Sequence, residues 1–254
     1  MSTPLSYHRP ENLNDARKLL ADDGSRPLLI HPRMDVEPYS TADAVVDLSL
    51  LNLNTIQQEG DVIRIGALTT LQDVADSPLL RTLARGILPE AASLTAHLGL
   101  RNVSTIGGVM MNPQSAVDVM LALLCLGVGA QTRVDVGAQG RVEVGAQTRV
   151  DVGAHGRAPL QNEISFSVSS SARAALERIA RTSHDAPIVA ICALKDKNVT
   201  RVAVGGVGIS PMLVDPAKAQ ESVSPVADFR GSVEYQREMV GVLVKRVMKR
   251  VETL

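Results

Sequence analysis

The residues best placed to do chemistry lie between Arg101 and Asp118, in the sequence RNVSTIGGVMMNPQSAVD. Gly107 and Gly108 lack a Cβ, so the backbone can turn tightly there and bring its N–H groups against an anion such as a phosphate. Asp118 follows ten residues after Gly108, and its carboxylate can accept hydrogen bonds from ribose hydroxyls. Most Gly-Gly pairs are ordinary turns, so the rest of the sequence must decide whether this segment binds a phosphate-bearing cofactor.

Asp118 also has an interpretation that needs no ligand. Residues 115–126 carry apolar side chains at helical spacing and are followed by Gly127, which predicts a largely buried helix with Asp118 in its first turn. A carboxylate at that position is favoured by the helix dipole by about 0.3–1 kcal/mol without any cofactor. Both interpretations stay open on these residues alone.

The composition narrows the classes of function. The chain has 254 residues, enough for roughly two domains, and its 26 Lys and Arg residues nearly balance 27 Asp and Glu residues. This balance gives no broad attraction for nucleic acid or for an anionic membrane. We find no signal-like N-terminus and no apolar run approaching about 18 residues, so we expect a cytoplasmic protein without membrane insertion.

The two cysteines, Cys125 and Cys192, each lie within an apolar run. We expect them to be buried thiols. They cannot hold an iron–sulfur cluster, and no Cys/His spacing is typical of zinc, so we expect no metal in this chain. The sequence places no nucleophile beside a base, and we predict no catalytic residue.

The glycine segment must be positioned by a series of short strands and helices. We first expect a helix from Leu13 with strands at 27–30 and 44–48, which together form a β-α-β-like unit. A hairpin of 55–58 and 62–66 around Glu59-Gly60 follows. We then expect a helix from Thr69 or Thr70 to Asp76 and another over 89–98 that stops at Gly99.

Residues 128–159 are four successive copies of one octapeptide, VGAQTRVD, VGAQGRVE, VGAQTRVD and VGAHGRAP. Because eight is an even number, a strand keeps the charged residues of every copy on one face and the central valines on the other. We favour a β meander or a protruding hairpin with opposite charges paired across strands. A disordered glycine-rich linker is the alternative.

The composition changes after the repeat, and a second domain is expected to begin near Pro159. Residues 172–180 predict a helix that leads to a strand at 187–194, and residues 199–207 return as its antiparallel partner. A final helix is expected from Ser232 toward Glu252. The cations near its end suit a helix C-terminus and need no nucleic-acid partner.

Several ordered segments of this chain resemble one family. They are Tyr7 with Arg9-Pro10, Val46-Asp47-Leu48, Ile65-Gly66-Ala67-Leu68-Thr69-Thr70, Arg101-Asn102, Thr105-Ile106-Gly107-Gly108, Gly205-Gly206-Val207 with Pro211, and Gly231-Ser232-Val233-Glu234-Tyr235. Together these segments resemble the FAD-binding subunit of molybdenum hydroxylases, which includes the medium subunit of aerobic carbon monoxide dehydrogenase and the flavin domain of xanthine dehydrogenase.

This resemblance implies an α+β fold in which two α/β subdomains, about 1–55 and 56–158, form an FAD-binding domain of the molybdopterin dehydrogenase type. A smaller α+β domain over 159–254 would follow. It also implies a hetero-oligomer, in which a large subunit carries the molybdenum cofactor and a small subunit carries [2Fe–2S] clusters. FAD would pass electrons from those clusters to an external acceptor.

Carried over by position, the diphosphate of FAD would be contacted by Thr105, Ile106, Gly107 and Gly108, and the ribose of its AMP half by Asp118. The family asparagine after the glycine pair is Val109 here, and Asn112 is the partial substitute we consider. The cofactor would perform the redox chemistry while the protein positions it.

A second departure affects the other side of the expected cofactor. The family has a diphosphate loop resembling AGGTDL near residue 30, whereas this chain has Leu29-Ile30-His31-Pro32-Arg33-Met34. Both glycines are missing, and Pro32 has no N–H to offer a phosphate. A flavin-free scaffold or assembly subunit of the same kind of complex is therefore the alternative hypothesis, and a stand-alone nucleotide-binding module is a third.

Overall fold

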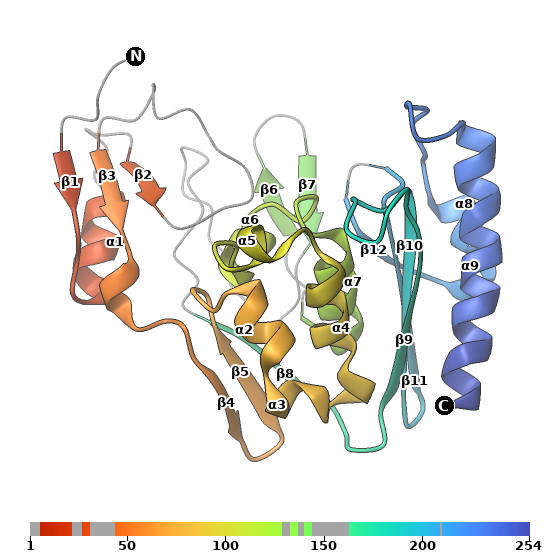
Figure 1. Cartoon of the computed structure of the whole chain (residues 1–254), viewed down its shortest axis with the longest axis horizontal. Coiled ribbons are helices and arrows are strands. Elements are labelled where there is room, and N and C mark those ends of the chain that lie inside the picture. The colour runs from red at the N-terminus through yellow and green to blue at the C-terminus, as the bar shows by residue number, and fades with distance from the viewer. Residues whose placement is uncertain are drawn as a thin grey trace.

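The computed structural model describes residues 6–21, 27–30, 44–128, 133–136, 140–143, 163–208 and 210–254. Three parts follow one another across the molecule (Figure 1): a small parallel sheet with one helix, a central helical part with an antiparallel sheet, and a C-terminal sheet covered by a long helix. Within the described residues, no helix is long and apolar enough to cross a membrane. The expected α+β fold is confirmed.

The first part is the β-α-β unit that the sequence predicts. Its elements are β1 (Ser6–His8), α1 (Leu13–Ala21), β2 (Pro27–Ile30) and β3 (Ala44–Asp47), and the strands pair in parallel in the order β1-β3-β2. Ala16 of α1 packs against Val46 and Leu48 in a small separate core. A one-turn 3-10 helix, η2 (Ser49–Leu51), leads out of this unit.

The central part begins with the expected hairpin. β4 (Ile56–Glu59) and β5 (Val62–Gly66) pair in antiparallel register, and Gly60 adopts φ 60° in the turn between them. β8 (Glu163–Ser167) joins the other edge of β5. This strand follows the expected domain start at residue 159 but extends the sheet of the central part.

Short helices cover this sheet and differ from expectation in one stretch. In order, they are α2 (Leu71–Asp76), α3 (Pro78–Arg81), η3 (Ala84–Gly86), α4 (Ile87–Leu94), α5 (Leu98–Arg101), α6 (Ile106–Met111) and α7 (Val117–Leu126). The single helix expected over 89–98 is wrong, because α4 ends at Leu94 and Ala96 takes φ 52°. Gly99 does not stop that helix but lies inside α5, which His97 caps through its ring nitrogen.

Two strands are described within the octapeptide array. β6 (Arg133–Val136) and β7 (Gly140–Glu143) form an antiparallel pair. Their register pairs Arg133 with Glu143 and Asp135 with Arg141, as the hairpin interpretation of these copies predicts. The third and fourth copies, residues 144–159, lie outside the described residues.

The C-terminal sheet is antiparallel, with strand order β12-β11-β10-β9. Its strands are β9 (Arg173–Ile179), β10 (Val189–Asp196), β11 (Val199–Gly205) and β12 (Met212–Val214). The expected pairing of β10 with β11 is confirmed, whereas the helix expected over 172–180 is wrong because these residues form β9. After β12 come η5 (Pro216–Lys218), α8 (Ala219–Ser222) and α9 (Val233–Thr253), which Ser232 caps as predicted.

The two faces of β10 belong to two cores. Ala190, Cys192 and Leu194 pack toward α7, and Val189, Ile191 and Ala193 pack toward α9. Successive strand residues point to opposite faces, so one strand joins the central helices to the C-terminal layer. α7 is buried along its whole length between these elements.

Candidate functional site

Thr105 is the residue around which the predicted site is organised. Its backbone forms an isolated β-bridge with Thr70, in which the Leu71 N–H donates to Ser104 O at 2.8 Å and the Ile106 N–H donates to Thr69 O at 3.0 Å. The bridge brings together the ends of two segments that the family resemblance singled out, 65–70 and 105–108. Thr70 and Thr105 thereby cap two neighbouring helices, α2 and α6.

The tight turn expected at Gly107-Gly108 is instead the first turn of α6. Thr105 is the N-cap, and its Oγ1 accepts a hydrogen bond from the Gly108 N–H at 3.3 Å. The Gly107 N–H donates to Ala67 O at 2.8 Å. The N–H groups of Ile106, Gly107 and Gly108 are therefore all bonded within the protein, not presented as a free cradle for an anion.

The two glycines nevertheless have different surroundings. A Cβ on Gly107 would meet Ala67 O at 2.9 Å, so Gly107 is needed for the close approach of α6 to the end of β5. A Cβ on Gly108 would meet only Thr105 Oγ1, at the ordinary distance of 3.5 Å. The half-buried Gly108 is therefore not required as a glycine by the packing of the described residues.

Asp118 lies in the first turn of α7, as predicted, and is only 3% exposed. Its Oδ2 lies 3.4 Å from Arg178 Nη1 of β9. Burial raises the pKa of the Asp118 carboxyl to about 6, and the Arg178 charge opposes part of that rise. Its second oxygen, Oδ1, is buried without a hydrogen-bond partner among the described residues.

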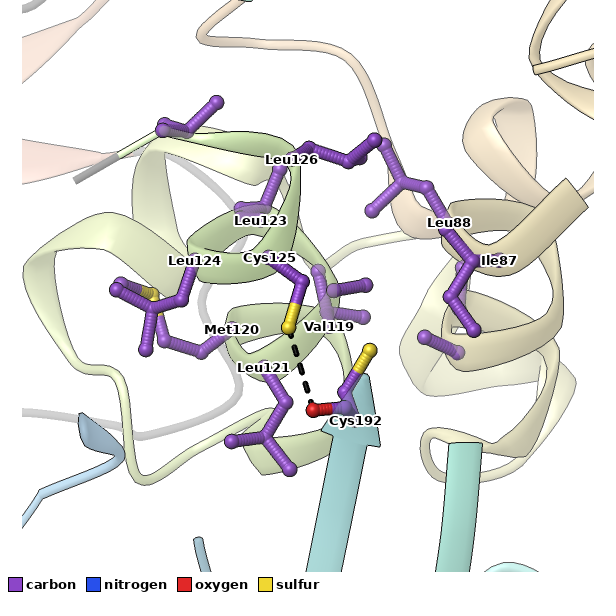
Figure 2. Packing of buried hydrophobic residues seen from close by; sticks show 14 of the residues in the cluster. Ile87, Leu88, Val119, Met120, Leu121, Leu123, Leu124, Cys125, Leu126 and Cys192 are labelled. Carbon is purple, nitrogen blue, oxygen red and sulfur yellow. Dashed lines mark hydrogen bonds between the residues drawn. The ribbon is translucent and has the colours of Figure 1, made fainter. Parts of the chain in front are cut away.

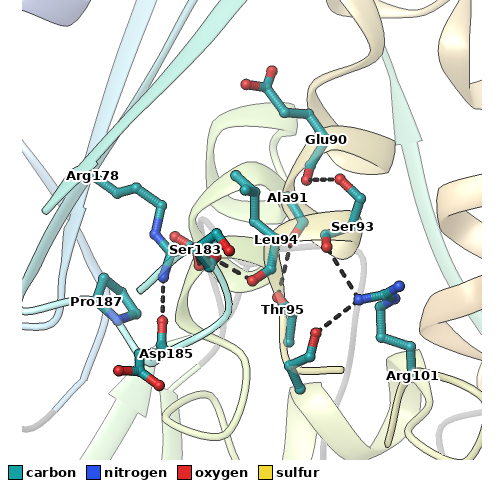
Figure 3. A network of polar contacts seen from close by, with 12 residues as sticks. Glu90, Ala91, Ser93, Leu94, Thr95, Arg101, Arg178, Ser183, Asp185 and Pro187 are labelled. Carbon is teal, nitrogen blue, oxygen red and sulfur yellow. Dashed lines mark hydrogen bonds and ion pairs between the residues drawn. The ribbon is translucent and has the colours of Figure 1, made fainter. Parts of the chain in front are cut away.

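Arg178 was not singled out in the sequence. Its guanidinium donates to Leu94 O at 3.3 Å, to Ser183 O at 2.9 Å and to Asp185 O, contacts that can be followed in Figure 3. Within the described chain its Nε has no acceptor. Nothing in the residues around Arg178 singles it out in the sequence. Because we expected a helix over 172–180, its position opposite Asp118 was not predicted.

Asn112, the last predicted contact, follows α6 directly. Its N–H donates to Gly108 O at 3.0 Å, and its own carbonyl accepts hydrogen bonds from Ser115 N at 3.0 Å and Ser115 Oγ at 2.7 Å. These bonds link α6 to the start of α7. The predicted residues 105–108, 112 and 118 are thus held on two consecutive helices that pack together, while residues 31–34 of the altered loop lie outside the described residues.

The cysteines are structural, as expected. Both are free and buried, and Cys125 Sγ donates to Cys192 O at 3.3 Å (Figure 2). The neighbouring Cys125 thiol and burial raise the pKa of Cys192, which keeps it a neutral thiol. Across the described part of the chain, no group of three His, Cys, Asp or Glu residues could hold a metal ion.

Comparison with known proteins decides the family. Residues 3–146 match the model of the FAD binding domain in molybdopterin dehydrogenase. The chain belongs to this family. It is 25% identical to the glyceraldehyde dehydrogenase medium chain of Sulfolobus acidocaldarius, over 97% of this chain and 98% of that protein. It is 27% identical to the carbon monoxide dehydrogenase medium chain of Afipia carboxidovorans, over 98% and 96% of the two chains.

Solved structures show the same fold. A chain of reconstituted CO dehydrogenase from Oligotropha carboxidovorans superposes with a TM-score of 0.78 at 24% identity, over 100% of this chain and 99% of that chain. A chain of carbon monoxide dehydrogenase from Hydrogenophaga pseudoflava gives a TM-score of 0.78 at 22% identity over the same shares. The chain therefore belongs to the family of the FAD binding domain in molybdopterin dehydrogenase by sequence and has the fold of these carbon monoxide dehydrogenase chains.

The residues of this FAD-binding domain fit the cofactor at two described points. A larger side chain at Gly108 is not excluded by the packing, so a ligand group can approach its backbone there, and Asp118 Oδ1 is a buried acceptor without a donor among the described residues. The backbone N–H groups of Ile106 and Gly107 do not fit as phosphate ligands here, because protein carbonyls already accept their protons. Contact with the diphosphate would therefore come from the half-buried Gly108 and from the hydroxyl of Thr105, a residue that is 2% exposed in this structure.

Proposed function

We propose that this chain is the FAD-carrying electron-transfer subunit of a molybdenum hydroxylase complex. Its iron–sulfur partner would carry [2Fe–2S] clusters, and its large partner the molybdenum cofactor at which substrate is oxidised. When bound, FAD supplies the electron-accepting chemistry between those clusters and an external acceptor. The full-length similarity to medium chains of such dehydrogenases supports this role.

The observation that carries the proposal is the junction of Thr70 and Thr105. The bridge between them fixes the start of α6, so that the Thr105 hydroxyl keeps a proton to donate while its oxygen accepts from Gly108. Gly108 then permits close approach of a large group. In this role the residues bind and orient the cofactor, and none of them acts as an acid or base.

The second candidate is the flavin-free scaffold subunit. It is favoured by the internal bonding of the Ile106 and Gly107 amides and by the low exposure of Asp118. A scaffold would keep the fold and its partners without the cofactor. The two functions differ in one measurable quantity, the flavin content of the assembled complex.

The deciding experiment is to purify the native complex gently, release its flavin by denaturation and quantify it against the protein. The electron-transfer proposal expects near-stoichiometric FAD in a yellow complex. Only traces of flavin in a complete complex would refute it and favour the scaffold. FAD bound to a chain that has no partners would favour a stand-alone nucleotide-binding module.

A matched pair of glycine variants tests the site itself. Gly108→Ala places a methyl group at the ordinary contact distance of 3.5 Å from Thr105 Oγ1, so it should keep the free energy of unfolding but lower FAD occupancy, and Gly108→Val should abolish binding. Gly99→Ala is the control, because Gly99 lies in the neighbouring α5 and its Cβ would meet only the exposed His97 ring. Unchanged FAD occupancy in both Gly108 variants would remove this glycine from the site.

A further inference from the structure

The two described strands of the octapeptide array, β6 and β7, form a sheet of their own (Figure 1). Among the described residues, no third strand pairs with either of them. Every second residue of a strand in an antiparallel pair directs its N–H and C=O away from the partner strand, so β6 and β7 each have an outer edge of unpaired backbone groups. A two-stranded sheet on its own is only marginally stable in water, and such an edge readily accepts a further strand.

The register of β6 and β7 indicates which strand this sheet can accept. Three of its aligned positions are Arg133 with Glu143, Val134 with Val142, and Asp135 with Arg141. Each strand therefore carries a tripeptide of arginine, valine and an acidic residue, and the antiparallel alignment sets an arginine opposite an acidic residue on both sides of the valines. Because the two tripeptides are alike, each of them is also complementary to a second copy of itself.

We propose that the outer edge of β6 pairs with β6 of a second copy of this chain. The strands run antiparallel about a two-fold axis at Val134, so Arg133 of each copy lies opposite Asp135 of the other. This contact repeats between two chains the alignment that β6 and β7 make within one chain. Both copies use the same surface, so the contact closes into a dimer with the strand order β7-β6-β6-β7. Opposite charges directly across strands favour this pairing.

The strand β6 is the better edge for this contact, although β7 carries the same kind of tripeptide. β7 begins with Gly140, and a glycine weakens a strand, whereas the four residues of β6 include none. Pairing through both edges would also extend the sheet without end instead of closing a dimer. The contact uses none of the residues of the proposed FAD site, so this inference does not rest on the proposed function.

The test compares two valine variants of the full chain by sedimentation velocity over a range of protein concentrations. Val134→Lys sets two lysines opposite each other at the two-fold axis, and these like charges should weaken dimerisation about tenfold or more. Val142→Lys is the matched control, because within one chain both variants set a lysine opposite a valine, whereas position 142 lies away from the axis. This control should dimerise as strongly as the unaltered chain.

A second arm exchanges the charges without removing them. In each of the first three copies the arginine and the acidic residue are interchanged, so the alignment within one chain stays complementary. The substitutions are Arg133→Asp, Asp135→Arg, Arg141→Glu, Glu143→Arg, Arg149→Asp and Asp151→Arg. The exchanged chain should dimerise with itself as strongly as the unaltered chain does. A mixed dimer sets arginine opposite arginine and should be about tenfold weaker or more, which native mass spectrometry of isotope-labelled and unlabelled chains measures.

Each other outcome overturns the proposal. An unaltered chain that is still monomeric at about 1 mM, where only weak association would be missed, would mean that no second copy pairs with β6. Weakening by Val142→Lys alone would assign the contact to β7, assemblies larger than a dimer would assign it to both edges, and equal weakening by both lysines would mean that they only disturb the hairpin. Free mixing of the exchanged and unaltered chains would place the dimer contact outside the array.

Discussion

Gly107 and Gly108 are neighbours in α6, but the protein needs them for different reasons. Gly107 allows α6 to approach Ala67, where any Cβ would be held 2.9 Å from a backbone oxygen that cannot swing away. Gly108 meets no such obstacle. The fold therefore requires a glycine at 107 but not at 108, and a role for Gly108 in binding a cofactor belongs to the proposed function.

This difference gives a prediction for stability. Gly107→Ala should lower the free energy of unfolding by about 1–3 kcal/mol through overpacking, whereas Gly108→Ala should leave it unchanged or raise it by up to about 1 kcal/mol, since alanine is the better helix former. Urea unfolding of the flavin-free chain measures both. Equal effects of the two substitutions would contradict the separate roles.

Asp118 predicts a dependence of stability on pH. Its pKa is raised from 3.8 to about 6 by burial, so the folded protein binds this proton more tightly than the unfolded chain does. The resulting stabilisation is complete below about pH 4 and is lost as the pH rises through about 6, with a total of roughly 3 kcal/mol.

The measurement compares urea unfolding of the flavin-free chain and of Asp118→Asn at several values between pH 4 and pH 7. The difference in free energy between them should move against the unsubstituted chain as the pH rises across this window. A difference that stays constant would show that Asp118 has the same pKa in the folded and the unfolded chain, and a difference that moves the other way would show that folding lowers its pKa.

At the scale of elements, the sequence predicts what depends on local chemistry. The helix starts at Thr70 and Ser232 follow from hydroxyls that accept hydrogen bonds from nearby backbone N–H groups. The turn at Gly60 follows from the missing Cβ, which permits its positive φ. β9 fails this test. Its residues are good helix formers, and its faces are both buried, with Leu176 in one core and Ala175 in the other, so no alternation shows. Pairing with β10 along seven residues overrides helix propensity.

The same limit applies to the candidate site. The motif at 105–108 and the position of Asp118 are visible in the sequence, because they depend on residue type and spacing. The internal bonding of the amides and the partner Arg178 are not, since they depend on where distant elements pack. For the domain division, we propose a boundary after β8, near residue 168, because β8 pairs with β5.

The capping box of α2 is the element whose energetics can be tested most directly. The Asp73 N–H donates to Thr70 Oγ1 at 3.0 Å, and the Thr70 N–H donates to Asp73 Oδ2 at 3.2 Å. Thr70→Ala should lower the free energy of unfolding by about 1 kcal/mol. In a double-mutant cycle with Asp73→Ala the two losses should not add, because each substitution removes the same reciprocal pair. Strict additivity in thermal or urea unfolding would contradict the box.

At the scale of the whole molecule, the C-terminal sheet is the layer that lies between α7 and α9. One face packs on α7 and the other on α9, so the helix that carries Asp118 cannot shift without disturbing both layers. The buried pair of Asp118 and Arg178 lies across this contact. Polar groups there favour one relative placement of α7 and β9, whereas apolar packing alone tolerates small slides.

The first residue of the octapeptide array, Val128, is part of the buried core. Val128 follows α7, is 1% exposed and donates its N–H to Leu123 O at 2.9 Å. Deletion of residues 128–135 removes one whole period, so Val136 takes the place of Val128 and the copies that follow keep their phase. Deletion of residues 128–134 differs by one residue, yet it brings Asp135 into that buried position.

We therefore expect the eight-residue deletion to keep the melting temperature within a few degrees, since shortening a connection by this much changes its closure free energy by a fraction of about 1 kcal/mol. The seven-residue deletion should cost several kcal/mol, because it buries an unpaired carboxylate and inverts the alternation of the strands behind it. Thermal unfolding of the two variants and the full chain measures this directly. If both deletions are as stable as the full chain, neither Val128 nor the phase of the repeat matters to the fold. If both are destabilised by the same amount, the length of the array matters instead.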